Sequence, residues 1–352
     1  MVTDDRGFGL ELESSYGETV ATSAYDLDWF VEADQARFSM NRGPVRKRGS
    51  SRMNKKARAG ISKPSGDSEH DVDLQRIGHY FRGYLDNYKH TAPASGSSIH
   101  THEFWGGEGK ELQSFRGIVM QDALKKYLTG MLINTLGFEV SDDSMKVTAN
   151  WVYKQEKAEI IGVDDGASFT RPDELEDDLF VMFYDILVKL NSKSLLGDNG
   201  IVTSANFSGN NNLAQDDSIG FGAMRPQARA LAKDRDNNIS LALSLTTEIL
   251  DDILAMEYGA TSARELDSCK IKNVPLELDI ALCEYATQSL KILFPNCTVG
   301  VTYDGSGTDV IKANLSLDSL GAAEVPLVDG TTEVYTDMYV QLKNKQGALT
   351  TS

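Results

Sequence analysis

Residues 239–246 read Ile-Ser-Leu-Ala-Leu-Ser-Leu-Thr, a strict alternation of branched apolar residues with small or polar ones. Successive side chains of a β-strand point to opposite faces of a sheet, so this pattern predicts a half-buried strand. The same alternation occurs in residues 146–154, 274–282 and 334–342. Residues 180–190 are nearly continuous in apolar residues, which predicts a strand covered on both faces. The chain is therefore expected to be mainly β.

Clusters of Asp, Asn, Ser and Gly separate these strands, and such residues favour turns. They occur at residues 141–144, 197–200, 208–212, 234–238 and 304–307. Many short strands divided by turns are typical of all-β folds.

Two segments have helical spacing instead. Residues 73–85 place four apolar side chains on one helical face: Leu74, Ile77, Phe81 and Leu85. Residues 247–258 are apolar over two turns, and Gly259 follows where a C-cap glycine belongs. Repeated strands with one or two flanking helices and long loops predict an antiparallel β-sandwich or barrel, and not a doubly wound sheet.

Charge is divided unevenly along the chain. The net charge is −17, yet residues 41–66 hold nine basic residues and no acidic one. The nine are Arg42, Arg46, Lys47, Arg48, Arg52, Lys55, Lys56, Arg58 and Lys63. Removing these nine positive charges from −17 leaves −26 on the other residues. A concentrated positive segment thus accompanies a broadly negative body.

Three interpretations of the basic segment remain open. Complementary charge steers association between surfaces, and a contact repeated head to tail between copies builds rings or filaments. Glycine, proline and serine also punctuate the segment, which is typical of a solvated loop. A nucleic-acid-binding arm needs only positive charge to contact phosphates. The segment contains no aromatic residue on which bases of a single strand would stack.

Motifs of enzymes and cofactor sites are missing. No Gly-Lys-Ser/Thr triplet, two-histidine zinc helix or serine nucleophile elbow occurs. His100 and His102 are a conceivable metal pair on one side of a strand, but no third ligand has suitable spacing. We therefore predict no catalytic residue, no cofactor and no metal site, and we expect a protein that is not an enzyme. No stretch approaches the ~20 apolar residues that a membrane span requires, so no membrane partner is expected.

The order of segments resembles the tail tube (major tail) protein of long-tailed bacterial and archaeal viruses. Residues 9–17 look like the first strand of that family with its acidic-small-aromatic-glycine turn, and residues 127–140 are similar to its Tyr-x-Gly strand. The later segments that resemble the family, in order, are 143–162, 201–207 with the asparagines 210–212, 290–299, 311–317 and 334–342. The chain is longer than compact members of the family, and its basic segment is heavier.

The resemblance implies one tail tube domain over residues 1–352, with a long basic loop at about 41–66 and a possible elaboration at about 67–120. It implies a bent sheet in each subunit, rings of six whose sheets join into a continuous barrel, and stacking of rings into a tube. The implied role is a passive conduit for viral DNA delivery. We expect its lumen to be acidic, because a negative wall repels the phosphate backbone of passing DNA.

The resemblance also implies partners. These are other copies of the chain, the tape-measure protein, the tail terminator, the distal tail and baseplate proteins, and double-stranded DNA in transit. The expected location is the tail of the virion, with assembly in the host cytoplasm. The nine basic residues are predicted to contact a neighbouring subunit or ring. Other virion components remain alternatives, namely a tail terminator, a distal tail protein or a capsid decoration protein, as does a nucleic-acid-binding protein that uses residues 41–66.

Overall fold

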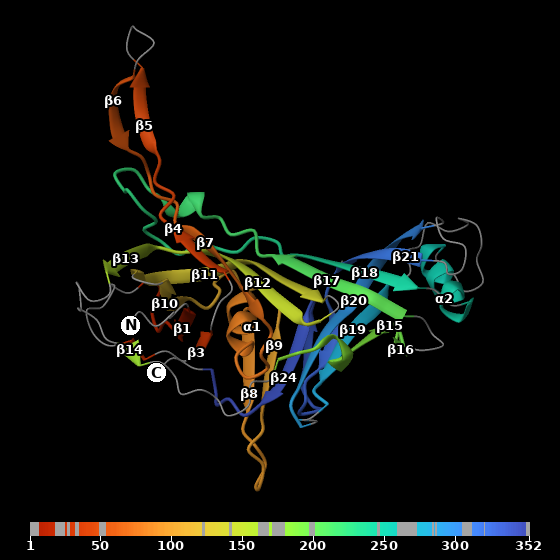
Figure 1. Ribbon diagram of the computed structural model, residues 1–352. Helices are drawn as coiled ribbons and strands as arrows, with labels where there is room; N and C mark the ends of the chain where they lie inside the picture. Colours follow the sequence, from red (N-terminus) through yellow and green to blue (C-terminus); the bar gives the residue numbers. More distant parts are fainter. Residues whose placement is uncertain are drawn as a thin grey trace.

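The computed structural model is mainly β, with an extensive antiparallel sheet and two short helices (Figure 1). It describes residues 7–17, 25–26, 29–31, 35–48, 54–121, 124–140, 143–160, 169–170, 180–196, 201–244, 247–258, 273–283, 285, 287–304, 312–319 and 321–349. Eighteen of the described strands belong to one connected sheet. The sequence-based prediction of a mainly β fold with one or two helices is confirmed.

The connected sheet divides into three segments. The first segment consists of β3 (Trp29–Val31), β1 (Gly7–Leu12), β10 (Phe115–Gln121), the first half of β11 (Leu124–Val140) and β13 (Gln155–Ile160). The second consists of β4 (Gln35–Ser39), β7 (Ser65–Asp71), β12 (Met145–Val152), the second half of β11, β17 (Ile201–Asn210), β18 (Asp236–Ser244), β21 (Lys312–Ser319) and the second half of β20 (Ser289–Asp304). The third consists of β16 (Lys193–Ser194), β15 (Ile186–Leu190), β19 (Val274–Ala281), the first half of β20, β24 (Tyr339–Asn344), β9 (His100–Trp105) and β8 (Asn87–Thr91).

Three two-stranded pairs and the helices complete the fold. The pairs are β5 (Pro44–Arg48) with β6 (Asn54–Ala59), β2 (Tyr25–Asp26) with β14 (Phe169–Thr170), and β22 (Ala323–Pro326) with β23 (Glu333–Thr336). The helices are α1 (Gly78–Tyr84), α2 (Thr247–Glu257) and the 3-10 turns η1 (Phe183–Asp185) and η3 (Asp216–Ser218). Residues 67–120, predicted as a possible elaboration, supply β7, α1, β8, β9 and β10.

The two longest strands join the three segments. β11 pairs with β10 and β13 over residues 124–131, with β12 from Leu132 and with β17 from Thr135, and its register with β12 breaks between Ile133 and Thr135. β20 changes partners in the same way, from β19 and β24 to β21, near Pro295. A proline has no backbone N–H to donate to a ladder, and a bulge bends a strand, so both positions are natural places for a sheet to turn.

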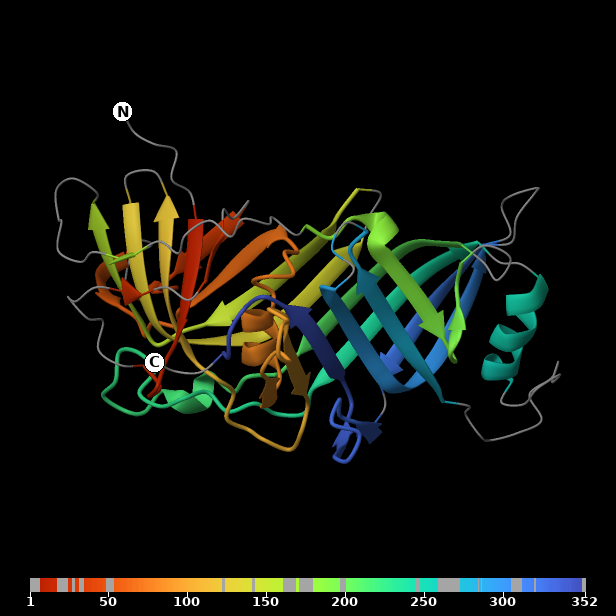
Figure 2. The same cartoon turned by 90° about the horizontal axis from the view of Figure 1, so that it is seen from below.

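The core lies between the second and third segments. A small apolar cavity is lined by Phe138, Phe207 and Ile239 from one segment and by Leu278 and Phe294 from the other, so their inner faces pack together. α1 lies beneath the middle of the sheet, beside β8 and β9 (Figure 2). One connected apolar cluster extends from β1 to β24.

The predicted helix at residues 73–85 is shorter than expected. α1 begins at Gly78, because the chain before it forms a turn around Asp73. The Asp73 carboxylate accepts the Gln75 amide at 2.8 Å, and the Asp73 carbonyl accepts the Ile77 amide at 3.0 Å. The four apolar residues of the predicted face are nevertheless all buried. The second predicted helix matches α2, and Gly259 lies outside the described residues.

Two strand predictions were wrong in part. Residues 180–190 are interrupted by η1, where the Asp185 carboxylate accepts the Met182 amide at 3.1 Å, and Tyr184 is exposed. Residues 334–342 are divided between β23 and β24, because the Thr336 hydroxyl pairs with both backbone groups of Met338 and closes a local turn.

Two of the segments predicted as turns belong in part to strands. Residues 208–210 continue β17, and residues 236–238 already belong to β18. The turn itself lies further on, at Asn212, whose φ of 48° is in the left-handed region that asparagine tolerates. The predicted turn at 197–200 lies outside the described residues, as does most of the one at 304–307.

A single buried carboxylate connects two of the segments that resemble the tail tube family. Glu13 accepts the amide of Gly17 at 2.9 Å and the amide of Gly130 at 2.8 Å. Both glycines have positive φ, 62° and 65°, which side chains rarely adopt. A Cβ atom at Gly130 would lie 2.8 Å from Cβ of Lys154 and 3.1 Å from the Tyr16 ring.

We predict that Gly130→Ala lowers the free energy of unfolding by about 2–4 kcal/mol, since it adds strain at positive φ to a steric overlap. Gly96→Ala is the matched control, because Gly96 has a φ of 87° but open space around it. That variant is expected to lose only about 1 kcal/mol. Urea unfolding of both variants measures the difference, and equal losses would mean that close packing at Gly130 has no energetic importance.

Candidate interaction surfaces

The basic segment forms a two-stranded ribbon that projects from one end of the molecule (Figure 1). Residues 41–66 were predicted to form a long loop, but residues 44–48 and 54–59 of that range form paired strands. β5 and β6 pair in antiparallel register, and the amide of Gly60 donates to the carbonyl of Gly43 at 2.9 Å, which closes the base of the ribbon. Glycine, serine and lysine are uncommon in strands, so the composition concealed the pairing.

The predicted contact residues lie along this ribbon. Arg46, Lys47 and Arg48 belong to β5, Lys55, Lys56 and Arg58 belong to β6, Arg42 and Lys63 flank the ribbon, and Arg52 lies outside the described residues. The backbone register places Lys47 opposite Lys56, and like charges in such positions destabilise an isolated hairpin. The side chains of Arg42 and Arg58 are exposed. The ribbon therefore concentrates positive charge away from the body of the molecule.

The ribbon is fixed to the body at its base. The Ser62 amide donates to the carbonyl of Met224 at 2.8 Å, and the Gln215 side chain donates to the carbonyl of Pro64 at 2.9 Å. The Lys63 ammonium forms an ion pair with Asp216 at 2.5 Å. These contacts attach the ribbon to the segment between β17 and β18.

Exposed apolar side chains surround the same base. Val45 and Ile61 extend from the ribbon, and Phe221 and Met224 extend from the neighbouring segment between β17 and β18. Arg225 is exposed beside them. Exposed apolar clusters rimmed by polar groups mark interaction sites. Sequence reasoning missed Phe221, for which the available signal was an aromatic residue between Gly220 and Gly222 in a turn-rich stretch.

A second surface is the outward face of the second segment, which we call the polar face. It comprises three rows of residues that run across neighbouring strands. The rows are Gly137, Ser208, Asn238, Asp318 and Thr298; Glu139, Asn206, Ser240, Ser316 and Gly300; and Ser204, Ala242, Asn314 and Thr302. These positions contain no aromatic and no basic residue, and their charged members are the exposed Glu139 and Asp318. The next row along the register, Ser244, Lys312 and Asp304, adds one residue of each charge.

The adjoining strands β12, β7 and β4 extend the polar face. They add three acidic residues, Asp67, Glu69 and Asp71, and two basic residues, Lys146 and Arg37. Lys146 forms an ion pair with Glu69 at 3.7 Å. Acidic residues therefore remain in excess over the whole face, and the face is composed of small polar side chains.

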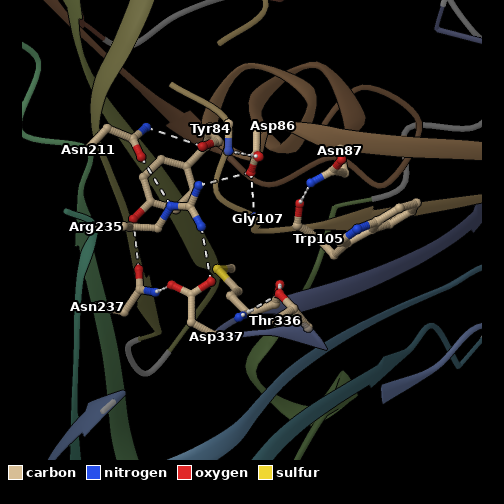
Figure 3. A network of polar contacts seen from close by, with 12 residues as sticks. Tyr84, Asp86, Asn87, Trp105, Gly107, Asn211, Arg235, Asn237, Thr336 and Asp337 are labelled. Atoms are coloured by element: carbon tan, nitrogen blue, oxygen red, sulfur yellow. Dashed lines mark hydrogen bonds and ion pairs between the residues drawn. The ribbon is translucent and has the colours of Figure 1, made fainter. Parts of the chain in front are cut away.

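A half-buried polar cluster surrounds Arg235 (Figure 3). Its guanidinium donates to Asp337 at 3.0 Å, to Asp86 at 3.4 Å and to the Asn211 side chain at 3.1 Å. It also lies 5.4 Å from the centroid of the Tyr84 ring. Burial raises the pKa of Tyr84, which stays a neutral hydroxyl.

Each member of this cluster is bound by another. Asp86 also accepts the amides of Gly107 at 2.7 Å and Gly109 at 2.9 Å (Figure 3). Asn237 donates to Asp337 at 3.0 Å and accepts the Tyr84 hydroxyl proton at 2.7 Å. Two backbone amides and one guanidinium thus occupy the two oxygens of the Asp86 carboxylate. The cluster links the residues that follow α1 and β17 with those that precede β18 and β24.

The histidine pair considered as a metal site is engaged within the protein. His102 is buried, and its two ring nitrogens lie 2.9 Å from the Tyr88 hydroxyl and 3.0 Å from the Gln346 carbonyl. The Nδ1 of His100 lies 2.8 Å from the Nε2 of His90. Within the described part of the chain, no group of three His, Cys, Asp or Glu side chains has a geometry that could hold a metal ion.

Comparison with known proteins adds no family to these observations. No protein-family model matches the sequence, and no curated protein is significantly similar to it. Among the described residues, none of the helices has the length and apolar composition needed to cross a bilayer. The surfaces above are therefore the basis for any functional proposal.

We predict that Arg235→Met lowers the free energy of unfolding by about 2–3 kcal/mol, because it removes the cation that donates to the half-buried residues Asp86 and Asp337. Lys89→Met is the control, since it breaks the ion pair between Lys89 and Asp329 at the surface, and we expect its unfolding midpoint to stay close to that of the wild type. Thermal or urea unfolding of the two variants tests this. Equal unfolding midpoints of the two variants would show that the Arg235 cluster contributes no more to stability than the surface ion pair.

Proposed function

We propose that this chain is a structural virion protein that assembles with copies of itself into stacked, hexameric rings, and that these rings form the tail tube of a long-tailed virus. The observation that carries the proposal is the polar face. It is broad, continuous over five neighbouring strands, free of basic and aromatic residues in its three rows, and acidic in net character.

Such a face suits the wall of a DNA channel. Double-stranded DNA carries a dense line of phosphates, and basic side chains bind it by releasing condensed counterions. Aromatic side chains bind single-stranded bases by stacking. On the extended polar face the basic residues Arg37 and Lys146 are outnumbered by Asp67, Glu69, Asp71, Glu139 and Asp318. A wall in which carboxylates exceed cations in this way lets DNA slide past. In this proposal Glu139 and Asp318 face the lumen.

The strand edges support the assembly. In the described part of the chain, β13 pairs along one edge with β11 and β4 pairs along one edge with β7, and no described strand pairs with their other edges. Unpaired edges are templates for pairing with another chain, and closure of a sheet into a barrel removes them. Six copies that join their sheets in a ring would satisfy these edges.

The basic ribbon supports a head-to-tail contact. A ribbon that concentrates positive charge and a body with the remaining −26 are complementary between neighbouring copies. Because the two surfaces differ, their contact is heterologous and propagates from one copy to the next. Arginine is suited to such contacts, since its planar guanidinium binds carboxylates through two hydrogen bonds.

The remaining partners follow from the family that the sequence resembles. The tape-measure protein would occupy the lumen before DNA, and the terminator and distal tail or baseplate proteins would close the two ends. The chain would reside in the virion tail after assembly in the host cytoplasm. A terminator, a distal tail protein or a decoration protein would share much of this surface but would not form open-ended tubes.

One observation favours a second candidate function. A two-stranded β-ribbon fits the major groove of DNA, and β5 with β6 is such a ribbon and is basic. A nucleic-acid-binding protein would retain duplex DNA with a steep loss of affinity as salt rises. The tube proposal expects the isolated protein to retain little DNA, because the negative body repels it.

Negative-stain microscopy of the purified protein, dilute and concentrated, at low and high salt, tests the proposal. We expect stacked rings or tubes of uniform width with a central channel. The triple variant R46E/K47E/R48E is expected to fold but not to form tubes, since its ribbon no longer complements the acidic body. The control K110E/K193E/K233E changes the net charge equally at exposed lysines elsewhere and should still assemble. If the wild-type protein stays monomeric under every condition, the tube proposal is excluded. If the ribbon variant still forms tubes, only the predicted contact of the ribbon is excluded, and the tube proposal stands.

The polar face has its own test. E139K/D318K tubes should form normally but retain duplex DNA at low salt, because cations then line the channel. E324K/E333K makes the same charge change at exposed positions of β22 and β23, and its tubes should release DNA like the wild type. DNA retention is measured by sedimentation of tubes with labelled duplex. Equal retention by the two variants would place the polar face away from the channel.

A further inference from the structure

Aromatic and imidazole rings form a stack on one face of the β8–β9 hairpin. His90 lies opposite His102 in the register of the two strands. The ring of His90 is 5.1 Å from that of His100 and 5.2 Å from that of His102, measured between centroids. The stack continues through Tyr88, whose ring is 6.0 Å from that of His102, to Phe104, 5.1 Å from Tyr88.

The protonation state of His102 follows from its hydrogen bonds. A backbone carbonyl can only accept, so the Nε2 of His102 must donate to the Gln346 carbonyl at 3.0 Å. In the neutral ring the Nδ1 is then an acceptor, and it receives the hydroxyl proton of Tyr88 at 2.9 Å. The Tyr88 oxygen in turn accepts the amide of Leu349 at 2.9 Å.

These bonds hold the end of the described chain. Residues 345–349 follow β24, and Gln346 and Leu349 are bound to His102 and Tyr88 as described. Leu349 is buried, and a Cβ atom at Gly78 of α1 would lie 3.0 Å from its Cδ1 atom. The amide of Lys345 donates to the Gln75 side chain at 3.1 Å. The segment is thus attached to the hairpin through one neutral imidazole and one hydroxyl.

A second proton on His102 disturbs this arrangement. Nδ1 becomes a donor, so the Tyr88 oxygen faces two donors and its own proton loses its acceptor. The new positive charge is also buried among other bases. The titratable and charged groups around it are His79 and Arg82 from α1, Tyr88 and His90 from β8, His100 from β9, and Lys345 at the start of the segment. The neighbouring residues of β24, Leu342 and Asn344, are uncharged.

The pKa values agree with this geometry. The pKa of His102 is lowered from its ordinary 6.5 to about 4, chiefly by burial and in smaller part by the neighbouring His90 and His100. Burial lowers the pKa of His90 as well, and His100 adds to that effect. Burial likewise lowers the pKa of His79 to about 4.

We propose that this ring stack is a proton-operated clasp: neutral His102 holds residues 345–349 on the β8–β9 hairpin, and protonation of His102 releases them. The clasp goes beyond the proposed tube function and does not depend on it.

The direction of the pH effect on the attached state follows from the linkage between proton binding and stability. The attached state keeps His102 neutral, whereas the released state exposes it to water with an ordinary pKa. The attached state therefore loses stability as pH falls from 6.5 toward 4, and the equilibrium constant for release rises up to about tenfold per pH unit.

Hydrogen-exchange mass spectrometry of the full chain tests the clasp. Protection of the amides in residues 345–349 is compared at about pH 7 and about pH 4.5, each corrected for the intrinsic exchange rate. We expect protection there to fall by at least about tenfold at the lower pH, while β17 and β18 remain protected. Unchanged protection in residues 345–349 overturns the proposal, and so does simultaneous loss in β17 and β18, which would indicate global unfolding.

Variants separate the clasp from general acid sensitivity. His102→Gln can donate to the Gln346 carbonyl and accept from Tyr88 but cannot gain a charge, so protection of the segment should lose most of its pH dependence. A smaller response would remain through His79, whose Nδ1 lies 3.5 Å from the Gln346 side-chain nitrogen. His70→Gln replaces another buried histidine, which contacts Tyr80 instead, and should keep the wild-type response. H90Q/H100Q alters only half-buried positions and should shift release to lower pH, which keeps the test decisive if His102→Gln fails to fold. A pH response of His102→Gln equal to that of the wild type would refute the clasp.

Discussion

The backbone of β11 must find partners along both edges over seventeen residues, and this constraint organises the rest of the structure. Buried N–H and C=O groups are almost always paired, so each half of the strand carries its own pair of neighbours. At Asn134 the register breaks, and the carbonyl and side chain there accept the amides of Asn211 at 2.8 Å and Leu213 at 2.9 Å. Those contacts position the segment that leads to the base of the basic ribbon and then to Arg235. The ribbon, the Arg235 cluster and the polar face are therefore all placed relative to one bent strand.

Alternation in the sequence predicted those strands whose two faces differ. Residues 146–154 and 274–282 became β12 and β19 with buried and exposed positions in the expected order. The pattern failed where a side chain far along the chain interferes. Residues 334–342 alternate well, but Asp337 turns toward Arg235 and ends β23. The asparagines near 210 and 238 have turn propensity, yet pairing with neighbouring strands overrides it, because tertiary contacts outweigh weak local preferences.

The surfaces were predictable to different degrees. Nine clustered basic residues in an acidic chain are visible in the sequence, and the exposure of Arg42, Arg58 and Lys63 agrees with the preference of charged side chains for the surface. Their arrangement as a ribbon did not, since lysine and arginine give no strand signal. The polar face could not be identified in advance, because its members come from five strands and only their register brings Glu139 beside Asn206 or Asp318 beside Asn238. His90 and His102 illustrate the same limit, being twelve positions apart in sequence and opposite in the hairpin.

Charge segregation has a physical consequence for a protein of this kind. Lys63 shows that a basic residue of the ribbon can be neutralised within the chain, by Asp216, but it lies at the base, where the body is within reach. The strands β5 and β6 project away from the body (Figure 1), so in the proposed assembly their basic residues would meet the carboxylates of a neighbouring copy. Attraction of that type extends over about 10 Å at moderate ionic strength and weakens as salt rises. The apolar side chains of Val45, Ile61 and Phe221 at the ribbon base are insensitive to salt. A contact between copies that used both the basic ribbon and these apolar side chains would be guided by charge and retained by apolar burial. Guidance by charge would set the order of assembly, and apolar burial would keep a stacked assembly together.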